Sequence, residues 1–502
     1  MRFTTFLMII FSIFLISCKT NTIKKVELDD ASKKELTTEI DALSIVSDVY
    51  DTYQNSEIFL IKGVYYAANL LSQDFKLWGE EGNSYSQFNV SSNNDNLNNF
   101  WVLSYDGIIK ANKSILKLDY MFEEKIISLA LYNRLKAECY FNRALCYYYL
   151  ASTFGNVPLV DEIDEMAIIN NANVTQDDVF KWVVQDLTLA SEQLPFTFDS
   201  ETDLGRATKG AALAYLGKSY MWLKQYDKAI VAFNQLENHY ELMSDFLDIN
   251  SFKHQNNKES IFEIQFNGND NLGWGRDNYS TFIQSFSLPT ELGGAALVVA
   301  NPVLATSFEQ NDARKMATVI GPGESHPDAS INISSYNSVQ EKFQGMNTLG
   351  TKDKPWLGDD GERSGYYGVK NWRAPDPSAS ASTVFSKANV ILMRYGEILL
   401  ELAESKFKTG DIEGAKILMN KIRKRAKLEP VDSEDLMPVL LNEYRFELSG
   451  EYSLWFALRR SGQHFDYIKN NFGIEIPMGH DLFPIPQEQL KLNKELKQNK
   501  GY

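Results

Sequence analysis

Apolar residues recur every three or four positions through most of the first half of the chain, which predicts amphipathic helices. One such run extends from Tyr132 to Thr153, and Gly155 follows as a helix-ending residue. Another run begins at Asp177 and ends before Pro195. Residues 45–245 are therefore predicted to be mainly helical.

Two segments carry small and aromatic residues at the spacing of tetratricopeptide units, which are pairs of antiparallel helices. The first copy runs from Ala214 to Phe233, and the second runs from Leu399 to Met419 with a turn at Gly410. Small residues let two helices approach closely, and aromatic rings fill the space between successive pairs. We expect these distant segments to stack into one scaffold.

Residues 246–386 have a different character. Ser260 to Phe266 alternates as a short strand would, and the residues after it are rich in Gly, Asn, Asp and Pro. A structureless segment of this length is improbable in a compact protein unless it is functional. We predict loops, short strands and small helices over the helical scaffold. The polar segment from Gly79 to Asn99 is also predicted to be a loop.

The N-terminus has the features of a secretory signal. An apolar run from Phe6 to Ile16 follows Arg2 and is too short to cross a bilayer core of ~30 Å as a helix. The run ends at Cys18 in a sequence that resembles a bacterial lipobox, which implies cleavage and lipidation at Cys18. The alternative is an ordinary signal peptide in which Cys18 is incidental.

These patterns divide the chain into five parts. We predict a signal peptide, a lipid-anchored tether, a first helical part, a loop-rich insert that faces the ligand, and a second helical part with the C-terminal signature. Their bounds are 1–17, 18–44, 45–245, 246–386 and 387–502.

Composition is that of a globular protein, with 44% hydrophobic and 23% charged residues. The net charge of −16 excludes a surface suited to nucleic acid or anionic lipid, and the short basic run Arg423 to Arg425 is interpreted as a solvated face. Cys139 and Cys146 lie about 10.5 Å apart along a predicted helix, too far for a disulfide, so we expect two buried thiols.

No catalytic motif is found: there is no H-E-x-x-H pair, Walker loop, G-x-S-x-G elbow or dinucleotide fingerprint. We therefore predict that the chain is not an enzyme, although a carboxylate pair of the glycosidase type is not visible in a sequence. No cofactor is predicted. Structural calcium is a minor alternative at residues 93–96, 269–271 and 359–360, where turn formation is the simpler explanation.

Three segments combine aromatic rings with amide or charged neighbours, as a carbohydrate site requires. Trp274 is the strongest candidate because it lies between two glycines. The alternative for each ring is that it anchors a loop to the scaffold. The predicted ligand-binding residues are Trp78, Tyr85, Trp274, Arg276, Asp277, Tyr279, Trp356, Tyr366, Tyr367 and Trp372.

Six blocks in order along the chain resemble the SusD/RagB-like outer-membrane lipoproteins of the Bacteroidetes. The blocks are Trp101 to Asn112, Arg134 to Leu159, Gly205 to Gly210, Arg394 to Glu404, Glu443 to Arg460, and Leu482 to Tyr502. Their charged residues include Arg134 and Glu138 at helical spacing, and Glu443, Arg445, Glu447, Arg459 and Arg460, for which we expect a structural network.

The resemblance implies a mainly α, tetratricopeptide-like scaffold with a loop-rich insert. It also implies a lipid-anchored, surface-exposed protein of the outer membrane that binds oligosaccharide or peptide nutrients and delivers them to a SusC-type TonB-dependent transporter. Lys19 to Lys25 departs from the pattern, because it lacks the acidic cluster associated with export to the outer face. Two other classes remain as alternatives, a helical scaffold without a nutrient ligand and a surface hydrolase.

Overall fold

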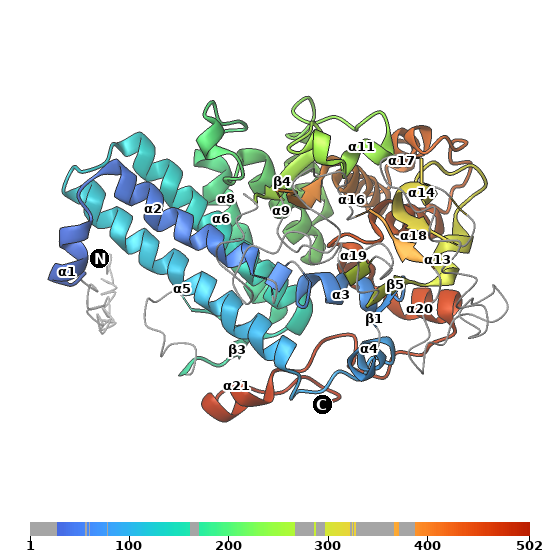
Figure 1. Cartoon of the computed structure of the whole chain (residues 1–502), viewed down its shortest axis with the longest axis horizontal. Coiled ribbons are helices and arrows are strands. Elements are labelled where there is room, and N and C mark those ends of the chain that lie inside the picture. Colours follow the sequence, from blue (N-terminus) through green and yellow to red (C-terminus); the bar gives the residue numbers. More distant parts are fainter. Residues whose placement is uncertain are drawn as a thin grey trace, which may run out of the picture.

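Helices form most of the protein, and both halves of the chain contribute to one body (Figure 1). The structure is a computed structural model that describes residues 28–55, 58–59, 61–77, 79–160, 170–266, 286–287, 297–321, 324, 326–327, 366–370 and 387–502. The mainly helical fold predicted from the sequence is confirmed.

Two long helices form the centre of the first half. Asn94 caps α5 by accepting a hydrogen bond from the Leu97 backbone N–H at 3.1 Å, and Ser128 caps α6 in the same way. Gly155, at φ 76°, ends α6 as predicted. Helix α2 packs against both. The bounds are α2 (Glu39–Tyr50), α5 (Asp95–Glu123) and α6 (Leu129–Phe154).

Helical structure begins earlier than the sequence pattern indicated. Helix α1 (Asp30–Glu35) and the start of α2 lie inside the segment predicted as a tether, so the C-terminal part of residues 18–44 is folded. The reason is a capping box: the Thr38 hydroxyl accepts from the Asp41 N–H at 3.3 Å, and the Asp41 carboxylate accepts from the Thr38 N–H at 2.7 Å. Two polar residues thus start a helix.

The two predicted repeats pack together through contacts between α10 of the first and α16 of the second. In the first pair, a Cβ added at Gly217 would lie 2.3 Å from the Phe233 ring, so only glycine permits this approach of α9 to α10. In the second pair, Gly410 adopts φ 90° at the turn. The bounds are α8 (Gln176–Gln193), α9 (Lys209–Trp222), α10 (Tyr226–Asn234), α16 (Tyr395–Lys408) and α17 (Ile412–Arg425).

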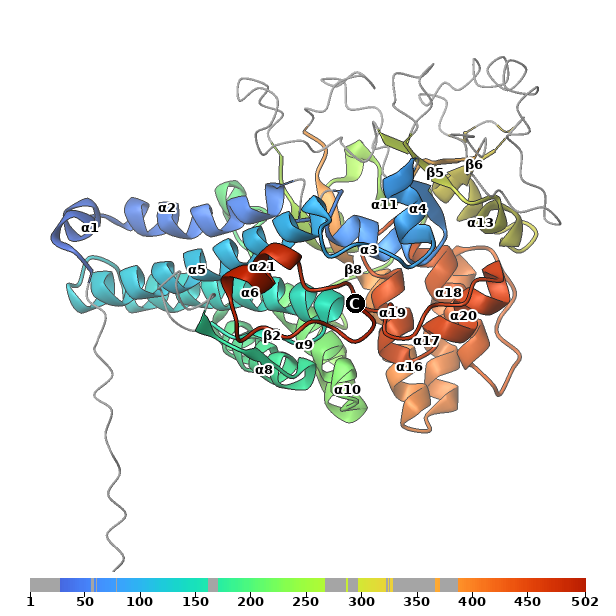
Figure 2. The same cartoon turned by 90° about the horizontal axis from the view of Figure 1, so that it is seen from below.

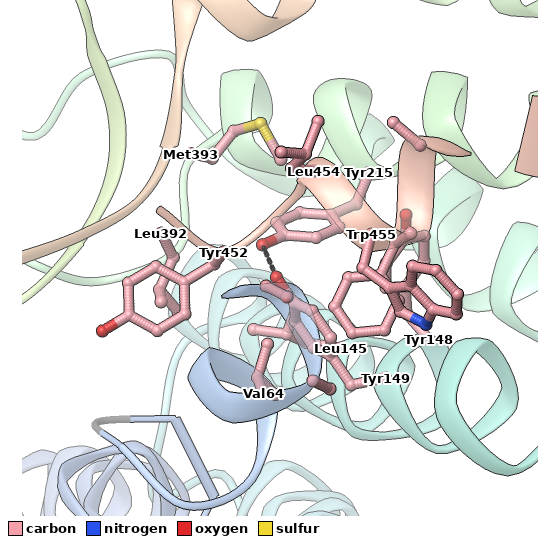
Figure 3. Close-up of a cluster of buried hydrophobic side chains, with 14 of the residues drawn as sticks. Val64, Leu145, Tyr148, Tyr149, Tyr215, Leu392, Met393, Tyr452, Leu454 and Trp455 are labelled. Atoms are coloured by element: carbon pink, nitrogen blue, oxygen red, sulfur yellow. Dashed lines mark hydrogen bonds between the residues drawn. The ribbon is translucent and has the colours of Figure 1, made fainter. Parts of the chain in front are cut away.

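The hydrophobic core joins distant segments (Figure 3). The hydroxyls of Tyr149 on α6 and Tyr215 on α9 are 3.0 Å apart and hydrogen-bonded, and Tyr148 packs edge-to-face on both rings. Trp455 from the C-terminal helices and Met393 from β8 complete this cluster. The helices of the C-terminal part are α18 (Met437–Leu448), α19 (Leu454–Ser461), α20 (His464–Phe472) and α21 (Gln487–Leu492).

The described strands form short antiparallel pairs: β1 with β5, β2 with β3, β4 with β8, and β6 with β7. The strand predicted from Ser260 is confirmed as β4, and it pairs from Ser260 with Arg394 to Ile264 with Val390 across a register shift. The strands are β1 (Phe75–Leu77), β2 (Val157–Pro158), β3 (Asn173–Val174), β4 (Ser260–Ile264), β5 (Val298–Ala300), β6 (Val319–Ile320), β7 (Tyr367–Gly368) and β8 (Val390–Arg394).

The remaining helices are η1 (Asp51–Gln54), α3 (Val64–Leu70), α4 (Glu80–Ser86), η3 (Glu201–Asp203), α11 (Phe246–Ile249), η4 (Phe252–His254), α13 (Pro302–Ser307) and α14 (Lys315–Thr318).

Cys139 and Cys146 are free thiols buried on α6, as predicted from their spacing. Burial raises the pKa of Cys146 to about 12, so the thiol stays protonated at neutral pH. Within the described part of the chain, none of the helices combines the length and apolarity that a membrane span requires.

A buried cluster of charges joins the repeats to α19. Lys218 of α9 pairs with Glu397 and lies 3.8 Å from Glu401, both on α16. Arg460 donates to both oxygens of Glu404 at 2.9 Å and lies 3.6 Å from Glu401. Burial raises the pKa of Glu401 to about 7, although Lys218 and Arg460 act in the opposite direction.

The raised pKa of Glu401 predicts a loss of stability with rising pH. The folded state holds a proton on Glu401 up to about pH 7, whereas the unfolded chain releases it near its usual pKa of 4.5. Unfolding therefore releases a proton in this window, and the free energy of unfolding falls as the pH rises through it. Glu401→Gln should remove this dependence and raise the free energy of unfolding at about pH 8 by roughly 2–3 kcal/mol.

Urea unfolding of both proteins at a series of pH values measures this difference. Glu404→Gln is the matched control, because both Glu404 oxygens accept from Arg460 and the change should destabilise the protein at every pH. Parallel pH profiles for wild type and Glu401→Gln would contradict the assignment.

Candidate ligand-binding site

The described parts of the insert gather on one side of the molecule (Figure 2). Strands β5 and β6 and helices α11 and α13 lie there with α4, whereas α8, α10 and α16 lie on the opposite side. We call the first side the insert face. It is the side on which the sequence predicts ligand binding.

Strand pairing fixes the insert to the scaffold. β1, which follows α3, pairs with β5 from Phe75 with Ala300 to Leu77 with Val298. The Ala300 N–H donates to the Tyr366 carbonyl oxygen at 3.1 Å, which places β7 beside β5. Gly368 of β7 then lies so close to Phe75 that an added Cβ would be 2.7 Å from the ring. The insert strands thus extend a scaffold strand.

Tyr366 is the predicted ligand residue that the described structure leaves partly exposed. Its ring packs on Gly321, where an added Cβ would lie 2.4 Å from the Tyr366 Cε1 atom. The neighbouring Tyr367 is only 3% exposed, because successive side chains of a strand point to opposite faces. The expectation that Tyr367 presents its ring at the surface is therefore wrong.

Tyr85 is also misplaced by the sequence prediction. The segment from Gly79 to Asn99 is not a continuous loop, because α4 occupies Glu80–Ser86 and α5 begins at Asp95. Tyr85 lies on the inner side of α4, fully buried, with its ring edge-to-face on Tyr66 and Phe483 at centroid distances of 5.6 and 5.7 Å. In this position its ring is not available to a ligand.

The other predicted positions lie outside the described residues and stay predictions. They are Cys18, Trp78, Trp274, Arg276, Asp277, Tyr279, Trp356 and Trp372. Within the described residues, no group of three His, Cys, Asp or Glu side chains is arranged to hold a metal ion. Residues 93–96 form the turn, the cap and the first two positions of α5, where Asn94 accepts from Leu97.

A buried network of charged side chains lies between the insert and the C-terminal helices. Arg394, at the end of β8, donates to Glu259 at 2.9 Å, to Glu447 at 2.6 Å, and through two nitrogens to Glu451 at 2.7 and 2.8 Å. Arg425 of α17 also donates to Glu259, at 2.8 Å, and to Glu447. Each of these five residues is at most 9% exposed.

Two cations of the insert enter the same network. Lys370 donates to Glu451 at 2.8 Å and to the Glu447 carbonyl oxygen at 2.7 Å. Arg314 donates to Asp312 at 2.8 Å and to Glu443 at 2.7 Å. These contacts attach the insert to α18 and to the turn that follows it.

Three of the cations, Arg425, Lys370 and Arg394, share one aromatic ring. The Phe246 ring centre lies 5.0 Å from the Arg425 guanidinium carbon, 5.1 Å from the Lys370 Nζ atom and 5.7 Å from the Arg394 guanidinium carbon. Burial raises the pKa of Glu447, but Arg425, Arg394 and Arg314 outweigh burial and hold this pKa well below its usual range. Glu447 is therefore ionised at neutral pH.

Part of this network was missed by sequence reasoning. Arg423 and Arg425 were interpreted as a solvated face, yet Arg425 is buried and Arg423 donates to Glu443 at 2.6 Å and Glu309 at 2.8 Å. A signal was present, because position 425 lies seven residues after the buried Leu418 on α17. Arg134 pairs with Glu138 at 3.0 Å as predicted. Arg445, Arg459 and Arg460 do not join the Glu443 and Glu447 network, because they pair with Asp74, Asp481 and Glu404.

Two family models match most of the chain. The model described as the SusD family matches residues 258–502, and a SusD-like model described as starch-binding associating with outer membrane matches residues 28–221. The chain belongs to the SusD/RagB-like family. A tetratricopeptide model matches residues 211–241 of this SusD-like chain, which confirms the first predicted repeat.

Relatives and solved structures cover nearly the whole chain. The SusD-like protein P2 of Formosa agariphila is 25% identical over 86% of this chain and 87% of the relative. A structure described as a laminarin binding SusD-like protein has a TM-score of 0.75, with 21% identity over 93% of this chain and 100% of that chain. Surface glycan-binding protein A from Bacteroides thetaiotaomicron, in complex with laminarihexaose, has a TM-score of 0.74, with 19% identity over 92% and 100%. These likenesses establish a shared fold.

Gly396 provides a test of the network in this SusD-like chain. A Cβ added at Gly396 would lie 2.4 Å from the Arg394 Nη1 atom, 2.7 Å from the Glu447 Oε1 atom and 2.8 Å from the Glu259 Oε1 atom. Gly396→Ala should therefore displace buried ion pairs and lower the free energy of unfolding by about 3 kcal/mol or more.

Denaturant unfolding measures the effect of Gly396→Ala. Gly414→Ala is the matched control on α17, since its Cβ first meets the side chain of Asp411, the exposed N-cap of this helix, and should change stability by about 1 kcal/mol. Equal free energies of unfolding for Gly396→Ala and Gly414→Ala would contradict the prediction, because they would show that the buried ion pairs can shift without loss of stability.

Proposed function

We propose that this protein is a non-catalytic lipoprotein of the outer membrane that binds oligosaccharides at its insert face and delivers them to a SusC-type TonB-dependent transporter. The observation that carries the proposal is the shared fold, over more than nine-tenths of the chain, with a laminarin binding SusD-like protein and a laminarihexaose-bound surface glycan-binding protein. The family description that includes association with the outer membrane supports the location.

The insert face supports a recognition role through its construction. Its strands extend β1 of the scaffold, and the buried charges of Lys370 and Arg314 hold the insert at two points to α18 and the following turn. A rigid base lets the surrounding segments carry ligand contacts without loss of fold. Trp274, Arg276, Asp277 and Tyr279 remain the leading ligand residues, with Trp78, Trp356, Tyr366 and Trp372 beside them.

Oligosaccharide is favoured over peptide as the ligand. Both solved neighbours named above carry a glucan in their descriptions, and the predicted segments pair aromatic rings with amides and charged groups. Binding by a shallow aromatic surface is expected to be weak, and it strengthens when the transporter and the lipoprotein enclose the ligand together.

Trp274→Ala tests the proposed ligand surface. Loss of one stacked ring should reduce the free energy of binding by about 1 kcal/mol or more, with little change in unfolding. Calorimetric titration of laminarihexaose, other neutral oligosaccharides and peptides measures the affinity. Phe465→Ala, which removes an exposed ring of α20 outside the insert, should leave it unchanged.

The outcomes separate the alternatives. Equal affinities of wild type and Trp274→Ala would remove Trp274 from the site. If the protein binds a barrel transporter but none of the oligosaccharide or peptide probes, a helical scaffold without a nutrient ligand is favoured. If it releases shortened products from a probe, a hydrolase is favoured.

The lipid anchor is tested at Cys18. Cys18→Ser should move the protein from the membrane fraction to the soluble fraction, because the sulfur that carries the lipid is absent. Mass spectrometry of the wild-type N-terminus should find a lipid-modified Cys18. An unmodified N-terminus at another residue would contradict the proposed anchor, and Ser17→Ala is a control that retains the cysteine.

A further inference from the structure

A second region of the scaffold surface combines aromatic rings with amide side chains. Residues 204–206, which we call the strap, line two hollows of about 220 and 280 Å³. The strap and two residues of β4, Phe262 and Glu263, line both hollows, so the hollows adjoin. None of the lining residues belongs to β5, β6 or β7 of the insert face.

The first hollow has an apolar floor and a polar rim. Tyr53 and Phe262, which are 2% and 3% exposed, form its floor. Ser47, Gln54 and Thr202 stand at its rim, on α2, η1 and η3. An apolar floor with a few polar groups is the usual construction of a small-molecule site.

The amide groups near the rim are held in fixed orientations. Gln54 donates from Nε2 to the Gln265 carbonyl oxygen at 2.8 Å. The Gln265 side chain donates to the Asn256 Oδ1 atom at 2.9 Å and accepts from the Asn389 Nδ2 atom at 2.8 Å. Side chains ordered in this way lose little further entropy when a hydroxyl-rich ligand binds.

The second hollow is lined by rings. Phe196 and His239 stack with ring centres 3.5 Å apart and planes at 5°, and His239 is exposed. Phe198 lines the same hollow, with the Arg134 guanidinium 4.6 Å from its ring centre. The exposed face of the stacked pair is suited to the C–H face of a sugar ring.

The strap is rigid, so both hollows are preformed. Arg206 donates to Glu138 at 2.9 Å and to the Ser47 hydroxyl at 3.0 Å, and it lies 3.0 Å from Asp203. Gly205, at φ +84°, lies so close to Gln265 that an added Cβ would be 2.2 Å from its Cγ atom. Arg206 and Arg134 share Glu138 and Asp203, so these four charges balance. Asp51 and Glu263 also line the first hollow, so the hollows disfavour an anion and suit a neutral, hydroxyl-rich ligand.

We propose that the two hollows beside the strap bind a neutral oligosaccharide, with one sugar ring in each hollow, as a second site apart from the insert face. Ring stacking at Phe196 and His239 supplies apolar contact, and Gln54 and Thr202 supply hydrogen bonds to hydroxyls, while Gln265 holds Gln54 in place. This site goes beyond the proposed delivery function and does not depend on it.

A pair of substitutions from opposite walls tests the second site. Ser47→Trp and Thr202→Trp each place an indole over the first hollow, on α2 and on η3. Ser44→Trp and Glu201→Trp are matched controls, because they add the same indole to exposed positions of the same elements that line neither hollow. Thermal unfolding confirms that each variant is folded.

The readout is calorimetric titration of the mature protein with laminarihexaose and with xylo-, manno- and galacto-oligosaccharides. The wild type should bind at least one probe beside the strap, whether or not the insert face binds it as well. Ser47→Trp and Thr202→Trp should each weaken this binding about tenfold or more, and the controls should not. A crystal soaked with that probe should show sugar beside Gln54 and His239.

Three results would overturn the proposal. They are a single binding site that is unaffected by both hollow-filling variants, no binding of any neutral probe at these residues, and sugar in the soaked crystal without any effect of the variants in solution. The last result would mean binding at crystal concentration only.

Discussion

The arrangement of this protein depends on the buried ion pairs of Arg394. Its guanidinium reaches three carboxylates that come from the strand β4 region, from α18 and from the turn after α18, so one side chain holds together segments distant in sequence. An isolated buried charge is costly, and removal of one partner from such a set usually costs about 3–5 kcal/mol. The close approach of Gly396 shows how little space the network leaves.

The scaffold carries different structures on its two sides. Tetratricopeptide-like pairs pack α9, α10, α16 and α17 on one side, and short strands extend β1 on the other. Because Lys370 and Arg314 tie the insert to the helices, the insert face is supported from below by electrostatics and from the side by strand pairing. With its strands and ion pairs held in this way, the insert face can change its outer segments without loss of the supporting structure.

Much of the fold was predictable, because long helices follow the apolar period and their ends follow capping residues such as Asn94, Ser128 and Gly155. Local polarity misled where a tertiary partner decides the outcome. Tyr85 lies in an Asn-rich segment, yet its ring is buried against Tyr66 and Phe483. Phe483 is distant from Tyr85 in sequence but adjacent to it in space. The short basic run predicts that Arg425 is a surface cation, whereas the fold buries it against Glu259 and Glu447. The helical period places position 425 on the buried face of α17, but it does not identify partners 22 and 166 residues away.

Arg394 and its partners also constrain how the chain reaches its final form. Glu259 is synthesised long before Glu447 and Glu451, so a chain that ends before α18 would hold Arg394 and Arg425 without most of their counter-charges. These ion pairs can therefore form in full only when the last helices are present. Because Lys370 and Arg314 also pair with residues of this region, loss of α18 and the turn after it would remove the attachment of the insert as well.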